Sequence, residues 1–277
     1  MKWKVSCIQM DVAFGELEPN YVKAEALLRA SGSVPSGKPS SPHGKAEEDL
    51  PSVLVLPELW TTGYALSALP ALADAEGKRT LLFLSSLAES LGTGIVGGSY
   101  ARRTKEGIRN TMPFLDEEGR LLGEYDKLHL FGPMQEPLHL RAGDQLGVVR
   151  LHDVLVAGVI CYDIRFPEWI RMQALAHARV VFVAAEWPES RLSHWRTLLM
   201  ARAIENQVFV VACNRVGSDP NHRFAGHSMI IDPWGQVLAE GGEDEEIVSA
   251  VLDFDEIDAA RARIPSLQDR RPQLYRL

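Results

Sequence analysis

Three reactive side chains, Glu58, Lys127 and Cys161, each stand where an apolar, strand-like stretch of the sequence ends. Glu58 follows "SVLVLP", Lys127 follows "LLGEYD", and Cys161 follows "VLVAGVI". In α/β folds with an open sheet, ligands bind beyond the carboxyl ends of the strands. We therefore expect the three side chains to converge on one pocket.

Together these side chains have the chemistry of acyl transfer. A cysteine attacks a carbonyl carbon as the thiolate, and a neighbouring, desolvated glutamate can accept the thiol proton. A lysine ammonium can stabilise the oxyanion of the tetrahedral intermediate, and the backbone N–H of Tyr162, directly after Cys161, can donate to the same oxygen. The set predicts a thioester intermediate that water then hydrolyses.

Each of these residues also has a purely structural interpretation. A cysteine at the end of a buried strand more often packs than reacts, Glu58 alone could cap the turn "PELWTTGY", and Lys127 alone could be a surface lysine. A cysteine–histidine pair is a further alternative. Four histidines are available for it, none singled out by its sequence context: His129, His177, His194 and His227. Cys7 and Cys213 fall within strand-like segments, and we expect both in the core.

The elements that must position these side chains follow from the hydrophobic periodicity. Strands are predicted over 4–12, 52–58, 94–103, 109–116, 121–127, 154–162, 180–187, 208–216, 227–233 and 246–254. Helices are predicted over 20–30, 77–92, from Pro167 onward, 194–207 and 255–264, with Gly92 as a C-terminal stop. Hairpin-like neighbours accompany the alternation of strands and helices, which favours a mixed α/β sheet system covered by helices over a purely parallel barrel.

Composition and charge exclude several classes of protein. The formal net charge of -8 argues against a general nucleic-acid binder. The start, "MKWKVSCIQMDV", lacks the apolar region and cleavage site of a signal peptide, and the longest apolar runs are too short to cross a bilayer. Three widely spaced cysteines form neither a disulfide framework nor a CxxC metal site. We therefore expect a cytoplasmic protein without a membrane or nucleic-acid partner.

One segment, residues 31–49, is rich in Ser, Gly and Pro. Because the core pattern resumes directly after it, we expect a flexible surface loop within a single domain spanning 1–277. No GxGxxG follows a strand, and no phosphate-binding loop or recognisable metal-ligand spacing occurs. The sequence therefore predicts a protein that uses no cofactor and no metal.

Three segments, "LPELWTTGY", "YDKLHLFGPMQE" and "ICYDIRFPEW", resemble in order and spacing the signature segments of the nitrilase superfamily, the carbon–nitrogen hydrolases. The similarity continues in "HWRTLLMARAIENQVFVVACNRVG" and "RIPSLQDRRPQLY", so it covers nearly the whole chain. It implies a four-layer α-β-β-α sandwich, a catalytic set of Glu58, Lys127 and Cys161, and assembly into a homodimer or a higher homo-oligomer.

The family also uses a second glutamate on the loop after the lysine segment, and Glu136 occupies that place here. The resemblance implies that Glu136 orients the lysine or the substrate amide; a solvated loop carboxylate is the alternative. Four aromatic residues flank the signature segments and are candidates to line the apolar part of the site, or else to pack in the core: Trp60, Tyr64, Phe131 and Trp187.

Within the superfamily, "ICYDIRFPEW" and "ARAIENQVFVVACNRVGSD" look most like the ω-amidase branch. Those enzymes hydrolyse the terminal amide of 2-oxo dicarboxylic monoamides such as 2-oxoglutaramate and release ammonia. Such a small-molecule substrate carries a free carboxylate, which an arginine can hold in a bidentate pair. Arg165 and Arg191 are the candidates, although either could instead tie down its own helix.

One residue departs from the pattern of the relatives. In "VAAEWPES", Glu186 stands where many of them carry a neutral Asn. If Glu186 faces the pocket, its charge would repel an anionic substrate. Other substrates of the superfamily therefore stay open, namely an N-carbamoyl compound, a nitrile or an amide repaired as metabolic damage. A non-catalytic scaffold is a further alternative, against which the intact Glu58, Lys127 and Cys161 argue.

Overall fold

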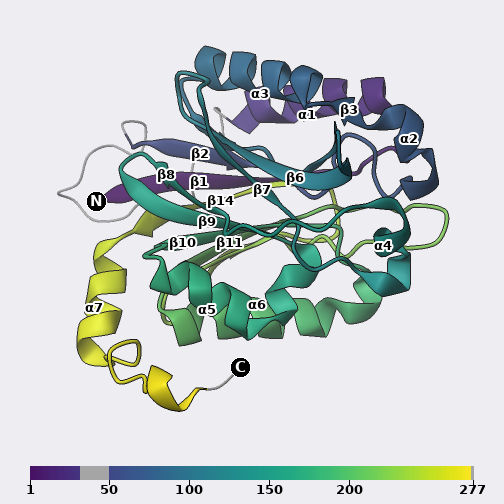
Figure 1. Cartoon of the computed structure of the whole chain (residues 1–277). Coiled ribbons are helices and arrows are strands. Elements are labelled where there is room, and N and C mark those ends of the chain that lie inside the picture. Colours follow the sequence, from purple (N-terminus) through teal and green to yellow (C-terminus); the bar gives the residue numbers. More distant parts are fainter. Residues whose placement is uncertain (32–49, 276–277) are drawn as a thin grey trace.

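The computed structural model describes residues 1–31 and 50–275. Two β-sheets lie face to face, and helices cover the outer side of each, which gives four layers in the order α-β-β-α (Figure 1). The first layer consists of α1 (Leu17–Ser31) and α3 (Lys78–Leu91), and the last of α5 (Pro167–Leu175) and α6 (Leu192–Asn206). This is the sandwich that the sequence resemblance implies.

The first sheet has the strand order β14-β1-β2-β4-β6-β5-β3, and β7 pairs with β6. Its strands are β1 (Lys2–Gln9), β2 (Ser52–Val55), β3 (Asp74–Ala75), β4 (Gly94–Val96), β5 (Tyr100–Thr104), β6 (Gly107–Leu115), β7 (Leu121–Asp126) and β14 (Glu246–Asp253). β2 and β4 are parallel, whereas β6 is antiparallel to both β4 and β7. β2 and β7 therefore end at the same edge of the sheet, which is where Glu58 and Lys127 follow them.

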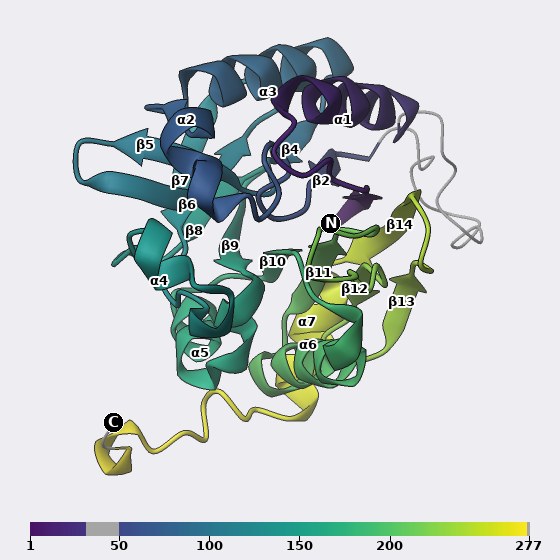
Figure 2. The ribbon, with the colours of Figure 1, turned by 90° about the vertical axis from the view of Figure 1, so that its right-hand side faces the viewer.

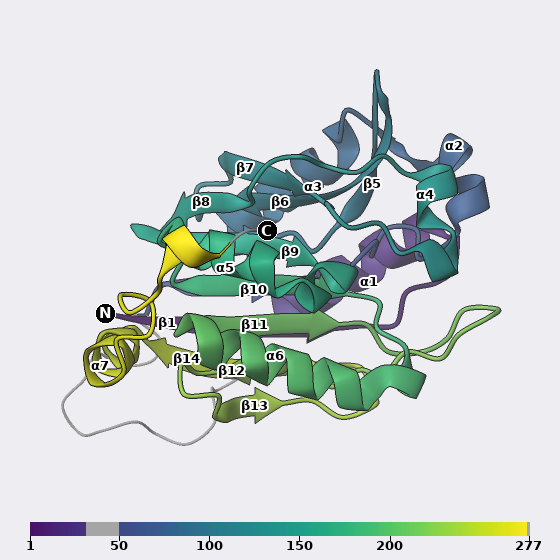
Figure 3. The ribbon, with the colours of Figure 1, turned by 60° about the horizontal axis from the view of Figure 1, so that its bottom comes forward.

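The second sheet has the order β13-β12-β11-β10-β9-β8. Its strands are β8 (Val148–Leu151), β9 (Val154–Ile160), β10 (Val180–Ala185), β11 (Phe209–Asn214), β12 (Met229–Ile231) and β13 (Val237–Glu240). β9, β10 and β11 are parallel neighbours, and α5 and α6 lie across their outer face (Figure 3). Because these strands are buried on both faces, their sequences are almost continuously apolar. Cys161, Glu186 and Arg215 follow them at one edge.

Three further α-helices lie in the described part of the chain: α2 (Leu69–Leu72), α4 (Glu136–His139) and α7 (Asp255–Arg263). α7 follows β14, and the segment after it extends away from the body of the sandwich below α5 (Figure 2). Within the two described ranges, no helix is both long enough and apolar enough to cross a membrane.

Most predicted elements are confirmed, including the start of α5 at Pro167 and the stop of α3 at Gly92, whose φ is 59°. Cys7 and Cys213 are fully buried in the core, as expected. The short strands β3, β8 and β13 were not predicted. Of the segment 31–49, Ser31 is the last residue of α1 and is buried; residues 32–49 lie outside the described residues.

The predicted strand over 94–103 is wrong in one respect, because it is interrupted between β4 and β5. At the interruption Gly98 has a φ of 57°, and a Cβ there would overlap with the carbonyl oxygens of Leu56 and Pro57. Ser99 then bonds to the same segment, since its amide donates to Pro57 O at 3.0 Å and its Oγ accepts from the amide of Leu59 at 2.9 Å. The interruption therefore fixes the turn that carries Glu58.

Candidate active site

Glu58, Lys127 and Cys161 meet between the two sheets, as the sequence predicts. Glu58 lies in the turn after β2, Lys127 directly follows β7, and Cys161 directly follows β9. The residues Glu58 and Lys127 are 0% exposed and Cys161 is 8% exposed. A charged pair is thus buried directly beside a cysteine that keeps a small exposed surface.

The carboxylate of Glu58 is held by four donors. Its Oε1 accepts from Lys127 Nζ at 2.8 Å, from Asn110 Nδ2 at 2.9 Å and from the Tyr64 hydroxyl at 3.0 Å. Its Oε2 accepts from the backbone N–H of Glu186 at 2.9 Å. These contacts leave Glu58 a single orientation. Asn110, in the middle of β6, is a member of this site that sequence analysis missed.

Lys127 joins Glu58 to the second carboxylate. Its Nζ donates to Glu136 Oε1 at 2.6 Å, and Glu136 Oε2 accepts from the amide of Phe131 at 2.6 Å. The hydroxyl of Tyr64 lies against both carboxylates and can donate its one proton to either. Glu136 is fully buried, so it is not the solvated loop carboxylate of the alternative interpretation.

The charges in this cluster compensate one another. Burial alone would lower the pKa of Lys127, but the carboxylates of Glu136 and Glu58 outweigh it and raise that pKa, so the ammonium persists. Burial raises the pKa of Glu136, and the adjacent Lys127 opposes the change. The cluster therefore carries two carboxyl groups around one permanent cation.

Cys161 begins a 3₁₀ helix over Cys161–Arg165 and has a φ of 43°. A left-handed backbone is uncommon for a residue other than glycine and persists only where its surroundings hold it. Burial raises the pKa of the Cys161 thiol, the charge of Glu58 raises it further, and Lys127 opposes this. The thiol therefore rests protonated, with the carboxylate of Glu58 as its hydrogen-bond partner.

The turn that carries Cys161 is held by Asp163, which sequence analysis did not single out. Asp163 Oδ2 accepts from the amide of Ile160 at 2.9 Å and from the Tyr125 hydroxyl at 2.7 Å. Its Oδ1 accepts from the amide of His129 at 3.0 Å and lies 2.8 Å from His129 Nδ1. Asp163 thereby ties the cysteine turn to the loop that follows Lys127.

The cysteine–histidine alternative finds no support in this geometry. His129 is bonded to Asp163 and stacks on Phe166 with ring centroids 3.6 Å apart. His227 pairs with Glu240, and His194 faces Arg165. Across residues 1–31 and 50–275, no hydrogen bond or ion pair joins a histidine to Cys161.

A narrow cleft reaches Cys161, and six of the seven predicted substrate-contact residues line it. The lining consists of Tyr64, Phe131, Met134, Cys161, Tyr162, Arg165, Glu186, Trp187, Pro188 and Arg191. Trp60 is not among them: it is fully buried against Tyr21 and Phe83, and its Nε1 donates to the carbonyl of Gly97. The Trp60 side chain therefore belongs to the core on the other side of the Glu58 turn.

Two guanidinium groups stand at this cleft. Arg165 lies 4.7 Å over the ring of Trp187, and Arg191 lies 5.3 Å over the ring of Phe131. Burial, followed by the charge of Arg191, lowers the pKa of Arg165. In the described part of the chain no carboxylate is paired with either side chain. The arginines are thus stacked on the cleft walls with their charges available to an anion.

Glu186 lines the cleft, but a cation offsets its charge. Its Oε2 accepts from Arg215 at 3.1 Å, and Arg215 also binds Asp11 Oδ1 at 2.9 Å. Burial raises the pKa of Glu186 to about 8, although Arg215 opposes the change. The expected repulsion of an anionic substrate is therefore largely removed.

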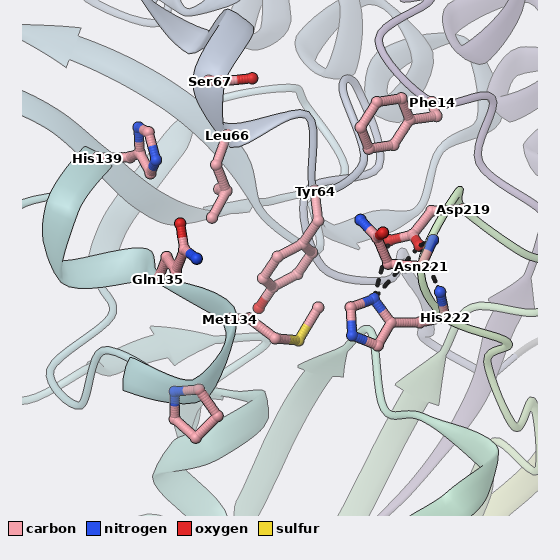
Figure 4. Close-up of a pocket in the computed structure, with 11 residues that line it drawn as sticks. Phe14, Tyr64, Leu66, Ser67, Met134, Gln135, His139, Asp219, Asn221 and His222 are labelled. Atoms are coloured by element: carbon pink, nitrogen blue, oxygen red, sulfur yellow. Dashed lines mark hydrogen bonds and ion pairs between the residues drawn. The ribbon is translucent and has the colours of Figure 1, made fainter.

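A second, wider pocket adjoins the cleft and shares Tyr64 and Met134 with it (Figure 4). Its remaining lining is polar on two sides, with His139 and Gln135 on one and Asp219 and His222 on the other. His222 Nδ1 lies 3.3 Å from Asp219 Oδ1. The cleft therefore lies beside a wider pocket with polar side chains on two sides.

The acidic side chains of the site are paired with cations and are not gathered as metal ligands. In the two described ranges, no group of three or more His, Cys, Asp or Glu side chains could hold a metal ion.

Comparison with known proteins places this site in a family. Residues 4–262 match the model of the carbon–nitrogen hydrolases. The chain is 48% identical over 275 residues to a 2-oxoglutaramate amidase of Bacillus subtilis (strain 168), covering 99% of this chain and 100% of the relative.

Two solved structures are similar over nearly the whole chain. One is a carbon–nitrogen hydrolase superfamily protein of Xanthomonas campestris with an arsenic adduct in its active site, at 30% identity and a TM-score of 0.87, covering 100% of this chain and 99% of that one. The other is a mutant amidase of Nesterenkonia sp. AN1 showing covalent addition of the acetamide moiety of fluoroacetamide at the active site cysteine, at 26% identity and a TM-score of 0.81, covering 99% and 95%. This chain belongs to the carbon–nitrogen hydrolase family.

Proposed function

We propose that this chain is an amidase that hydrolyses the terminal amide of small 2-oxo dicarboxylic monoamides such as 2-oxoglutaramate, with Cys161 as the nucleophile. The observation that carries the proposal is the meeting of Glu58 and Lys127 with Cys161, which lines a cleft. The same cleft presents two arginines without a carboxylate partner among the described residues. The substrate class is further supported by the close relative, which is named a 2-oxoglutaramate amidase.

In the first step Glu58 takes the proton of the Cys161 thiol as the sulfur attacks the amide carbonyl carbon. A C–S bond forms, and the π electrons of the carbonyl move to its oxygen. This oxyanion is stabilised by the ammonium of Lys127 and by the backbone N–H of Tyr162. Proton transfer is coupled to attack because the raised pKa of Cys161, caused chiefly by burial, keeps free thiolate scarce.

In the second step the tetrahedral intermediate collapses and the C–N bond breaks. Glu58 returns its proton to the leaving nitrogen, so that ammonia departs and a thioester remains on Cys161. A water molecule then gives a proton to Glu58 and attacks the thioester carbon. The C–S bond breaks, the sulfur regains the proton, and the dicarboxylic acid leaves.

Glu136 acts as a positioning residue in this scheme. Its Oε1 holds Lys127 Nζ at 2.6 Å, and its other oxygen is fixed by the amide of Phe131. The ammonium is thus held in one position between two carboxylates. Tyr64 contributes to the same alignment, because its hydroxyl bridges Glu58 and Glu136.

Arg165 and Arg191 would hold the free carboxylate of the substrate. Their stacking on Trp187 and Phe131 fixes the planes of both guanidinium groups before a ligand arrives. The four side chains therefore form the end of the cleft that distinguishes a keto acid amide from a neutral amide.

We also propose that the protein works in the cytoplasm as a homodimer or higher homo-oligomer, without cofactor or metal. Three widely spaced cysteines are typical of a protein in a reducing compartment. The assembly is supported by the resemblance to the family, which implies a homodimer or a higher homo-oligomer. Sedimentation of the purified protein measures the number of subunits.

The proposed function is tested by Cys161→Ala and by trapping. Ammonia release from 2-oxoglutaramate should be lost in the variant, while mass spectrometry of the wild-type protein mixed with substrate should show an acyl adduct on Cys161. Undiminished turnover in Cys161→Ala would end the proposal. A panel of amides, ureides and nitriles then identifies the preferred substrate, and a ureide or nitrile preferred over 2-oxoglutaramate would replace the proposed substrate class.

A further inference from the structure

Glu186 is a buried carboxyl group that the proposed reaction leaves without a role. It directly follows β10, whose residue Ala184 pairs with Ile160 of β9 and whose Ala185 pairs with Asn214 of β11. One residue further along each strand lie Cys161 and Arg215. Glu186 therefore stands at the carboxyl edge of the sheet with the nucleophile on one side and a buried cation on the other.

The two oxygens of Glu186 have different surroundings. Oε2 accepts from Arg215, whereas Oε1 is fully buried and has no hydrogen-bond partner in the described part of the chain. A buried polar atom without a partner is costly and calls for an explanation. Because Glu186 lines the cleft together with Cys161, a substrate bound there stands beside this carboxyl group.

We propose that Glu186 is a specificity-determining residue, whose Oε1 forms a hydrogen bond to an oxygen at the keto acid end of the substrate. This inference rests on the proposed function and adds to it a third contact beside the two arginines. Such a bond favours 2-oxo acid amides over neutral amides of the same length. It also accounts for a glutamate in a cleft that has to admit an anion.

The protonation state of Glu186 decides whether its Oε1 donates or accepts in this contact. With a pKa raised to about 8, mainly by burial, Glu186 is protonated at neutral pH. Its proton lies on Oε1, because Oε2 already accepts from Arg215. Oε1–H is then a donor to a keto or carboxylate oxygen. At alkaline pH the group ionises, the donor is lost, and its negative charge faces the same oxygens.

Several charged groups face Glu186 and set this behaviour. Arg215 lowers the pKa, whereas Glu58 and Asp219 raise it. Asp11 acts through Arg215, and the cleft adds Cys161, Arg165 and Arg191. The pH dependence of kcat/KM for one substrate would reflect the ionisation of all of these groups. In the ratio of kcat/KM for two substrates, the contributions of groups that take part equally in both reactions cancel.

The test compares kcat/KM for 2-oxoglutaramate with kcat/KM for pentanamide, which lacks both keto and carboxylate oxygens, between about pH 6 and about pH 9.5. In the wild-type protein the ratio should fall about tenfold as Glu186 ionises, as expected for loss of one hydrogen bond to a charged group. In Glu186→Gln, whose amide can accept from Arg215 and still donate from nitrogen, the ratio should stay high and independent of pH.

Glu189→Gln is the matched control, because it makes the same substitution three residues away at a side chain outside the cleft. It should keep the wild-type profile. A pH-independent ratio in the wild-type protein, or an unchanged profile in Glu186→Gln, would overturn the proposal. If kcat/KM for both substrates changes by one common factor in Glu186→Gln, the proposal is overturned as well, because such a change indicates a structural role of Glu186.

The wild-type profile alone decides the question if Glu186→Gln does not fold. Failure of the proposed function is recognisable separately, because the ratio would then lie below one at every pH. A ratio well above one that does not change with pH would instead leave the proposed function intact and refute only the role of Glu186.

Discussion

Replacement of Asp163 by asparagine tests whether the cysteine turn and the lysine loop are positioned as one unit. Asp163 is fully buried and each of its oxygens receives one backbone N–H, that of His129 on Oδ1 and that of Ile160 on Oδ2. In the Asp163→Asn variant the side chain would present one oxygen and one NH₂ group in the same space. Whichever way the amide is turned, one of the two backbone donors therefore faces another donor.

The cost follows from the contacts. One buried N–H without an acceptor costs ~1–3 kcal/mol, and the bonds that remain lose the strengthening of a charged acceptor, so we expect a total loss of ~2–5 kcal/mol in the free energy of unfolding. Cys161 has a left-handed backbone that depends on this support. If its sulfur shifts by about 1 Å relative to Lys127, kcat/KM falls by about 100-fold.

The assay combines urea unfolding with ammonia release, and Asp116→Asn is the matched control. Asp116 is also buried, and its Oδ1 accepts from the amides of Glu118 and Arg120, but it lies in the turn between β6 and β7, away from the cleft. That variant should lose stability and keep kcat. An Asp163→Asn protein with wild-type stability and turnover, or with no more loss of activity than the control, would refute the reasoning.

Two further predictions concern the cations of the site. Lys127→Met leaves Glu58 and Glu136 buried together without their cation, so urea unfolding should show a loss of ~3–5 kcal/mol in the free energy of unfolding. Ammonia release should fall by at least ~100-fold, because the variant lacks the donor that stabilises the oxyanion. Unchanged stability would contradict the buried ion pairs. Arg191→Met keeps the stacking volume on Phe131 and removes the charge, which should raise KM for 2-oxoglutaramate by ~10-fold or more. KM for pentanamide should not change, and an equal increase for both substrates would show that Arg191 does not bind the carboxylate.

The sequence is sufficient to predict the residues that stand at strand ends. Glu58, Lys127 and Cys161 each follow an apolar run, and the direction of parallel strands brings such positions to one edge. Their signature segments also lead to Glu136. The four-layer arrangement was accessible through the resemblance, whereas periodicity alone leads only to a mixed sheet covered by helices.

The remaining contacts depend on which strands become neighbours. Asn110 lies inside β6, and only the fold places its amide on Glu58. Asp163 does leave a signal, because a carboxylate within the apolar "ICYDIRF" needs buried donors, but its partner His129 is 34 residues away. The prediction that Trp60 lines the site is wrong, because proximity to Glu58 along the chain does not decide on which side of the turn a side chain lies.

The four donors around Glu58 have a stereochemical consequence for the reaction. Oε1 accepts from Lys127, Asn110 and the Tyr64 hydroxyl, whereas Oε2 accepts from the amide of Glu186. In the proposed reaction Glu58 Oε2 therefore takes the proton from the Cys161 sulfur. The same oxygen returns this proton to the leaving nitrogen of the amide. The departing NH₂ group must then approach from the side of the main chain at residue 186.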